Sequence, residues 1–198
     1  MRFQAIVLKN RAAEETKRDK DLIILAVVSA VLAGFAIHMD STPLLIGAML
    51  IGPFFDPILS LVVLGILDRN RKKFFHALLL LMVMTLTGWL AAVLQFMILK
   101  TFNGFKINEI INYGWLESLI VAMILGGVGM LMWVWTKTSS LAAGVSIAIS
   151  LVPPLVNTAI AFVFMNWEIF WHYSGLFLLN CVGILIGAFL VFKILVKD

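Results

Sequence analysis

One acidic residue, Asp56, lies inside a run that is otherwise apolar enough to cross a bilayer, and prolines stand on both sides of it. The surrounding residues 43–57 read PLLIGAMLIGPFFDP. A charged side chain at the centre of a membrane costs at least ~2.5 kcal/mol, so acidic residues there usually serve a function. Two roles are predicted for Asp56. It binds a cation or carries a proton, or it caps a half-helix that begins at Pro57.

A second stretch with paired prolines follows later in the chain, where residues 144–157 read GVSIAISLVPPLVN. A proline lacks the backbone N–H and leaves one helical carbonyl without its donor. Within a membrane such carbonyls are tolerated only where they face protein or a water-filled cavity. The two stretches are therefore predicted to be interrupted helices that hold a small solute or ion. The alternative is that the prolines only kink packed helices.

The residues predicted to bind this solute or ion lie around the two interruptions. Carbonyl, hydroxyl, amide and carboxylate oxygens would line one pathway there. Taken singly, each hydroxyl or amide is also explained by a hydrogen bond between packed helices. The predicted set is Gly52, Pro53, Asp56, Pro57, Ser60, Ser150, Pro153, Pro154 and Asn157.

The elements that must position these residues are membrane-spanning helices. Hydrophobic residues make up 62% of the chain, charged residues 13%, and the mean hydropathy is +1.05. In soluble domains apolar residues make up only about half of the chain. A spanning helix needs roughly 20 mostly apolar residues. Six such runs are predicted, at 22–39, 43–67, 74–99, 116–135, 141–164 and 174–196.

Lysine and arginine predict the orientation of these helices. Of the 15 such residues, only Lys100 and Lys106 fall on one side of a six-helix arrangement. The positive-inside rule then places both termini in the cytoplasm of a multi-pass protein of the cell (inner) membrane. Most of the six tryptophans, Trp133 among them, lie near predicted helix ends, as the aromatic belt of a membrane protein requires.

The two halves of the chain are predicted to be repeats of each other. Pro154 follows Pro57 by 97 positions, and the same shift places Gly144 on Gly47. Three helices in each half give the halves opposite orientations, which is a common construction of secondary transporters. The predicted class is an all-α integral membrane protein whose six helices form two inverted three-helix repeats, each with a proline-broken second helix. Its predicted parts are a cytoplasmic segment 1–21, a first repeat 22–99, an outer interfacial connection 100–115 and a second repeat 116–198.

The two proline-containing stretches resemble a known family. IGAMLIGP at residues 46–53 with PIL at 57–59, and SLVPPL at 150–155, are similar to two hallmark segments of domain-of-unknown-function family 389. That family groups uncharacterised hydrophobic prokaryotic membrane proteins. The resemblance implies an integral membrane protein of prokaryotic type in which both marked helices matter. Asp56 departs from the family pattern, which is expected to have glycine at this position.

These observations predict a membrane transporter or channel-like protein for an unidentified small solute or ion. Its pathway lies between the broken helices 43–67 and 141–164. The alternative is a non-transporting membrane scaffold, sensor or complex subunit. No enzyme, catalytic residue, metal site, cofactor or nucleic-acid partner is predicted, because no acid pair, phosphate loop or ligand spacing is present. The expected partners are the lipid bilayer, the solute or ion, and further copies of the chain.

Two further features concern the surroundings of the predicted helices. The charged residues 11–21 are expected to form a solvated helix that leads into the membrane, with a regulatory or lipid-binding role as the alternative. Small residues recur every four positions at Ala26–Gly34, Ala122–Gly126 and Gly183–Gly187. Such faces let helices approach closely, either inside the bundle or between copies of a homo-oligomer.

Overall fold

The computed structural model describes residues 2–15, 19–67, 71–102, 114–135 and 140–196. These residues form eight α-helices and no strand, so the predicted all-α class is confirmed for this part of the chain. Most of the predicted outer connection 100–115 lies outside the described residues. The helices are α1 (Arg2–Glu15), α2 (Asp19–His38), α3 (Thr42–Ile51), α4 (Phe55–Leu67), α5 (Arg71–Phe102), α6 (Trp115–Trp135), α7 (Ser140–Val163) and α8 (Trp167–Val196).

Length and hydropathy mark several of these helices as membrane spans. Among the described residues, α2, α5, α6 and α8 each contain a segment long and apolar enough to cross a membrane. The helices α3 and α4 meet the same criterion together, as a pair bent by 41°. In α7 the segment Leu151–Val163 is apolar but shorter than a span. The chain is a multi-pass membrane protein.

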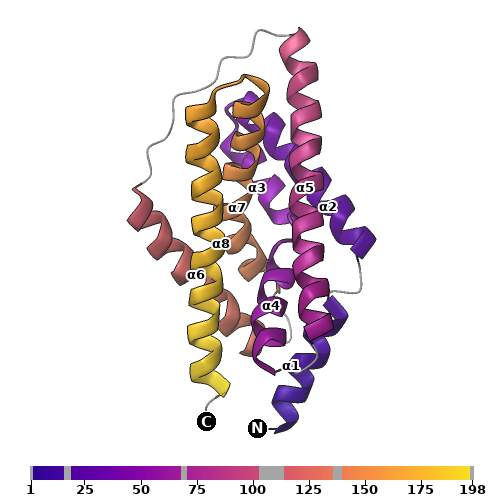
Figure 1. Cartoon of the computed structure of the whole chain (residues 1–198), viewed down its shortest axis with the longest axis vertical. Coiled ribbons are helices and arrows are strands. Elements are labelled where there is room, and N and C mark those ends of the chain that lie inside the picture. The colour runs from indigo at the N-terminus through magenta and orange to yellow at the C-terminus, as the bar shows by residue number, and fades with distance from the viewer. Residues whose placement is uncertain (1, 16–18, 68–70, 103–113, 136–139, 197–198) are drawn as a thin grey trace.

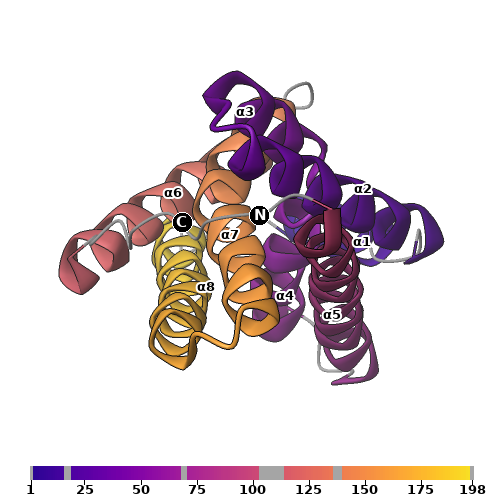
Figure 2. The ribbon, with the colours of Figure 1, turned by 90° about the horizontal axis from the view of Figure 1, so that it is seen from above.

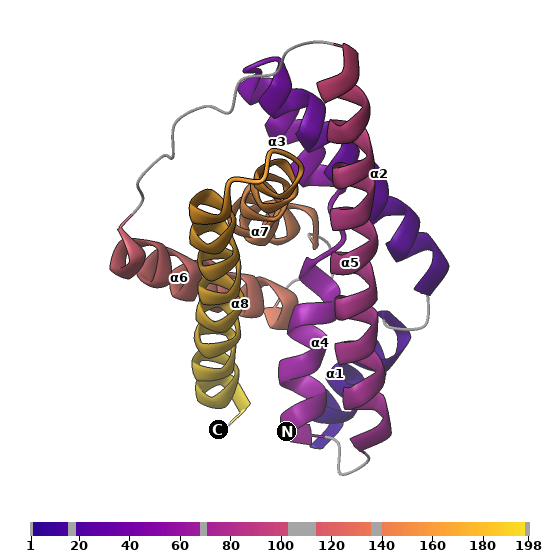
Figure 3. The ribbon, with the colours of Figure 1, turned by 45° about the horizontal axis from the view of Figure 1, so that its top comes forward.

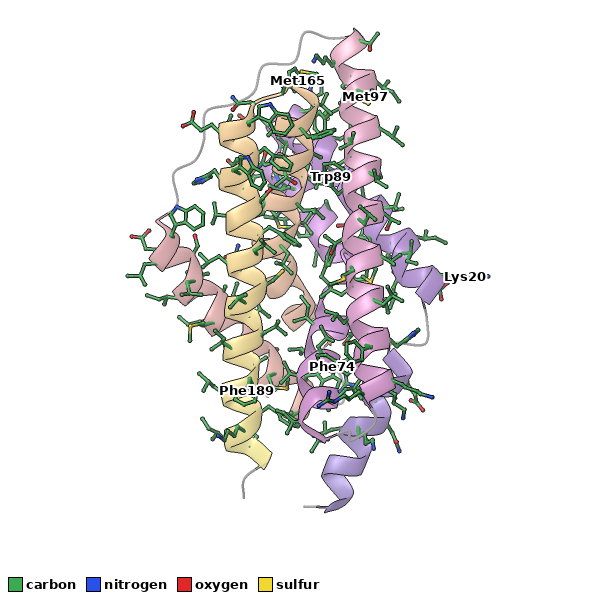
Figure 4. The ribbon with its side chains drawn as sticks, viewed as in Figure 1. Lys20, Phe74, Trp89, Met97, Met165 and Phe189 are labelled. Atoms are coloured by element: carbon green, nitrogen blue, oxygen red, sulfur yellow. The ribbon has the colours of Figure 1, made fainter. Side chains whose placement is uncertain are left out.

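The helices form one bundle with α4 and α7, which contain Pro57 and the pair Pro153–Pro154, in its interior. Viewed from above, α4 and α7 lie between α5 and α8, and α2 and α6 extend to opposite sides (Figure 2). Both termini lie at the same end of the bundle (Figure 1). Phe74 and Phe189 lie toward that end, whereas Met97 and Met165 lie at the other (Figure 4). This arrangement agrees with the prediction that both termini lie on the same side of the membrane.

Small residues allow two pairs of helices to touch backbone to backbone. A Cβ atom added to Gly187 in α8 would collide with the carbonyl oxygen of Met123 in α6, and one added to Gly126 would collide with that of Ile184. In α5, a Cβ on Gly88 would lie 3.3 Å from the carbonyl oxygen of Ala26 in α2. The small-residue faces of the sequence therefore pack inside the chain.

Three predictions about individual elements are wrong. The helix α7 is continuous from Ser140 to Val163 with Pro153 and Pro154 inside it, so the described backbone has no counterpart to the break of the first half. Packing on neighbouring helices holds the α7 backbone helical despite the missing N–H groups. The helix α1 is not simply solvated: it packs on α4 with Leu8 and Ala12 buried. Trp133 is only 2% exposed, and so it is no interfacial anchor.

Candidate functional site

The first half of the site is the break between α3 and α4, at residues 52–54. Pro53 has no N–H to donate to the carbonyl of Met49, which is the regular helical acceptor four residues back. The N–H of Gly52 bonds to Met49 instead, at 3.2 Å. This exchange removes the regular helical donor from the carbonyl of Ala48. The proline therefore ends α3 by rearranging the last hydrogen bonds of the helix.

A side chain from α2 replaces that donor. The hydroxyl of Ser29, which is fully buried, donates a 2.8 Å hydrogen bond to the carbonyl oxygen of Ala48. Ser29 Oγ also lies 3.0 Å from the place where a Cβ on Gly52 would stand. On another side, that Cβ position is 3.4 Å from Val152 in α7. Gly52 thus fits closely between α2 and α7. The α7 residue that it meets, Val152, directly precedes the proline pair of that helix.

Asp56 lies in the first turn of α4, immediately after the break. The helix begins at Phe55, and the N–H of Ile58 bonds to the carbonyl of Phe54. Asp56 is therefore inside the helix instead of at the N-cap position that was predicted as one of its two roles. A negative charge in the first turn is still stabilised by the helix dipole. Pro57 follows it where a missing N–H costs nothing.

The carboxylate of Asp56 is held by a residue far away in the sequence. The indole Nε1 of Trp133, in the last turn of α6, donates to Asp56 Oδ1 at 3.2 Å. The guanidinium carbon of Arg11 in α1 lies 4.8 Å from the centre of the Trp133 ring. Arg11 Nη1 also donates to the carbonyl oxygen of Trp133 at 3.0 Å. These contacts join α1, α6 and α4 in a chain that we call the Arg11–Trp133–Asp56 chain.

Ser60 lies one helical turn beyond Asp56 in α4. Its side chain is 0% exposed, and among the described residues its hydroxyl oxygen has no hydrogen-bond partner. A buried hydroxyl without a partner costs about 1–3 kcal/mol. Its oxygen and proton are thus both suited to a hydrogen bond with a polar solute beside α4.

The second half of the site is the middle of α7. Pro154 is buried, and Pro153 and Asn157 are half-buried. The neighbouring hydroxyl of Thr158 bonds to the carbonyl of Leu155 at 2.6 Å, so it is satisfied within its own helix. The side chain of Ser150 lies outside the described part of the structure. Val152, the residue directly before Pro153, is the α7 residue that lies next to the break.

Three residues of this region were not predicted from the sequence: Ser29, Trp133 and Arg11. Ser29 had a usable signal, because a lone hydroxyl in an otherwise apolar span needs an acceptor. Trp133 and Arg11 had none, since their partners lie 77 and 122 residues away in the sequence. Gln95 in α5 also joins two helices, because its Nε2 donates to the carbonyl of Val31 in α2 at 3.0 Å.

The donor and acceptor types around the break suit a cation or a proton better than an anion. Asp56 supplies a carboxylate, Ser60 a hydroxyl oxygen, and the proline pair of α7 leaves carbonyls without their regular donors. Hard cations prefer oxygen ligands of these kinds. No group of three or more histidine, cysteine, aspartate or glutamate side chains that could hold a metal ion occurs among the described residues.

Comparison with known proteins identifies the family. The family model described as "Domain of unknown function (DUF389)" matches residues 49–186, which include the break, Asp56 and the proline pair of α7. The chain belongs to this family. The resemblance found in the two proline-containing stretches is confirmed.

A curated relative covers nearly the whole DUF389 chain. An uncharacterised protein of Methanocaldococcus jannaschii is 27% identical over 192 residues, which are 94% of this chain and 58% of the relative. The chain therefore spans little more than half of that relative's length. No solved structure matches the chain.

Proposed function

We propose that this DUF389 protein moves a small cation or solute through the membrane, along a pathway between the α3–α4 break and the middle of α7. The observation that carries the proposal is the placement of Gly52 against Val152, beside the proline pair. It sets a break with rearranged hydrogen bonds against a second proline-containing helix, and an acidic residue and a buried hydroxyl follow that break in α4. Irregular backbone of this kind is typical of transporter binding sites.

The helix boundaries support an inverted repeat. A shift of 97 residues moves the end of α2, His38, onto Trp135, the last described residue of α6. The same shift moves Arg71, the first described residue of α5, to one residue beyond the start of α8 at Trp167. The third helices of the two halves run in opposite directions, α5 away from the end with the termini and α8 toward it (Figure 1).

Helix packing supports the same relationship. In the first half α2 packs on α5, and in the second α6 packs on α8. A glycine of the third helix faces a carbonyl of the first helix in both pairs: Gly88 faces Ala26, and Gly187 faces Met123. Ala26 and Met123 are themselves 97 positions apart. Figure 3 shows α6 crossing α8 on one side of the bundle and α2 crossing α5 on the other.

The location and assembly follow from the same proposal. The distribution of lysine and arginine favours the inner membrane with both termini in the cytoplasm. A homo-oligomer stays a prediction, because a small bundle needs partners to enclose a pathway. The small-residue faces no longer favour it, since they pack within the chain.

One observation favours the alternative of a non-transporting scaffold, sensor or complex subunit. The carboxylate of Asp56 accepts a hydrogen bond from Trp133, which is itself buried. A carboxylate fixed in this way can serve to lock α4 to α6 without ever meeting a solute. Transport measurements separate this alternative from the proposal.

The test is ion flux in liposomes that contain the full chain. Entrapped fluorescent indicators for H⁺, Na⁺ and K⁺ would report entry of each ion under a membrane potential. We expect one of them to enter faster than in empty liposomes, and Asp56→Asn to slow it about tenfold, because removing a charged ligand costs about 1.5–3 kcal/mol.

A matched variant controls for the loss of charge. Asp40 is exposed in the turn between α2 and α3, where its φ of 49° also suits asparagine. Asp40→Asn should therefore leave the flux unchanged. Flux equal to that of empty liposomes for all three ions would favour the scaffold.

A further inference from the structure

The helix α1 reaches the site although it precedes the first membrane span. It packs on α4, and its side chains Leu8 and Ala12 are buried there. Its other face is polar, with Asn10 and Glu14 exposed. The buried side chains described in α1 are one leucine and one alanine, and elements held by few buried apolar contacts are the ones that open locally most easily. The α1 helix lies at the end of the bundle that carries both termini (Figure 1).

Arg11 joins α1 to the end of α6 by two contacts. Its guanidinium lies over the Trp133 ring and donates to the Trp133 carbonyl at the same time. That carbonyl is among the last four of α6, which have no donor within their own helix. The planar guanidinium can stack and donate together, whereas the ammonium of a lysine cannot do so with the same geometry. Arg11 therefore fixes both the end of α6 and the orientation of the indole ring.

The orientation of that ring determines what Asp56 can do. With Arg11 in place, Trp133 points its N–H at Asp56 Oδ1. The bond engages one carboxylate oxygen and fixes its direction, one turn before Ser60, whose hydroxyl has no partner in the part of the chain that the structure describes. If Arg11 withdraws, the indole loses both contacts from α1, and its bond to Asp56 is the contact of the Arg11–Trp133–Asp56 chain that remains. That single bond is weaker support for the indole than the three contacts together.

We propose that α1 is a latch on the site: docked α1 keeps Asp56 bound to Trp133 and the pathway closed, and release of α1 opens it. The proposal rests on the transport function proposed above. It goes beyond that function by assigning a regulatory role to the N-terminal helix. In this role, Arg11 and Trp133 keep the pathway closed while α1 is docked.

The first test measures release of α1 without any transport. A Cys181→Ala background removes the cysteine of the chain, and Leu8→Cys places a thiol on the buried face of α1. Asn10→Cys, on the exposed face of the same helix, is the matched control. A water-soluble maleimide should label Leu8→Cys about tenfold more slowly than Asn10→Cys, because labelling requires α1 to undock. Adding Arg11→Gln should bring the two rates together.

The second test measures ion flux in the same liposomes. Arg11→Gln and Trp133→Phe should each speed entry of the transported ion several-fold. Trp133→Phe keeps an aromatic ring near Arg11 while it removes the N–H and part of the side-chain volume, so it should leave Leu8→Cys protected. That separation of labelling from flux distinguishes a latch that acts through the indole from general loosening of the bundle.

The two measurements keep the two proposals apart. Labelling of Leu8→Cys that is unchanged by Arg11→Gln overturns the latch, whatever the flux. Release of α1 without faster flux, in a protein whose wild type transports, also overturns the latch and leaves the transport function standing. Absence of flux in the wild type and in both variants overturns the transport function, and the latch with it.

Discussion

Ser29 in α2 donates its hydroxyl to the carbonyl oxygen of Ala48 in α3, at a distance of 2.8 Å. This is the carbonyl that loses its regular donor because Pro53 has no N–H. A residue of the first span thus completes the hydrogen bonding of the next element at the point where that element breaks. The break between α3 and α4 is thus stabilised by a hydrogen bond from α2. Measurements of protein stability can test this contribution.

Replacing Ser29 by alanine should destabilise the protein by about 1 kcal/mol, the usual size of a hydrogen bond between membrane helices. Unfolding in mixed detergent micelles would measure the difference in free energy. Ser60→Ala is the matched control, because Ser60 is equally buried and its hydroxyl has no partner among the described residues. It should cost nothing or stabilise. Equal losses for both variants would contradict the role of Ser29.

Gly187→Ala should destabilise the α6–α8 pair by more than ~2 kcal/mol, since its Cβ would collide with the backbone carbonyl of Met123 and force the helices apart. The same unfolding measurement applies. Gly47→Ala in α3 is the control, because a Cβ there has no other atom within 4 Å. That substitution should be neutral or stabilise by up to about 1 kcal/mol through helix propensity. A tolerated Gly187→Ala would mean that α6 and α8 are not in backbone contact.

Pro154→Ala should stabilise the chain by about 1 kcal/mol or more, because alanine restores an N–H inside the continuous helix α7. If the carbonyl that Pro154 leaves without a donor is part of the pathway, the substitution should also lower ion flux in liposomes. Pro43→Ala serves as comparison: Pro43 lies in the first turn of α3, where proline costs nothing. Neither stability nor flux should change there. Unaltered flux in Pro154→Ala would remove α7 from the proposed pathway.

The membrane topology predicts which positions a membrane-impermeant maleimide reaches in intact cells. In a Cys181→Ala background, Met165→Cys should be labelled from outside, because Met165 is 76% exposed in the turn after α7. Asn10→Cys and Lys193→Cys, both exposed and near the termini, should react only after the cells are opened. Labelling of all three positions in intact cells would contradict the positive-inside orientation.

The sequence predicts the helices well because hydropathy and proline act locally. The first break was expected near Pro53, and a helix end at Ile51 follows from the missing N–H. The second interruption was not found, since a proline pair bends or breaks a helix according to what packs around it. In α7 both prolines remain within the helix.

The partners of the site could not be predicted, because they depend on which helix faces meet. Asp56 was identified from the free energy that a charged side chain costs inside a membrane, which depends on that residue alone. Its bond to Trp133 requires the end of α6 to lie against the start of α4, and a single sequence does not contain this information. The position of Trp133 near a helix end favoured an interfacial anchor. The same position instead allows the residue to reach Asp56 and Arg11 together.

The backbone contact between α6 and α8 limits how this protein can change shape. Carbonyl groups stand where side chains would otherwise separate the two helices, at Met123 and Ile184. A slide by even one residue would drive a side chain into a peptide group. Any conformational cycle that keeps this contact therefore moves α6 and α8 together as one body. The surfaces that this pair presents to α4 and α7, where the prolines lie, are then the places where sliding can occur.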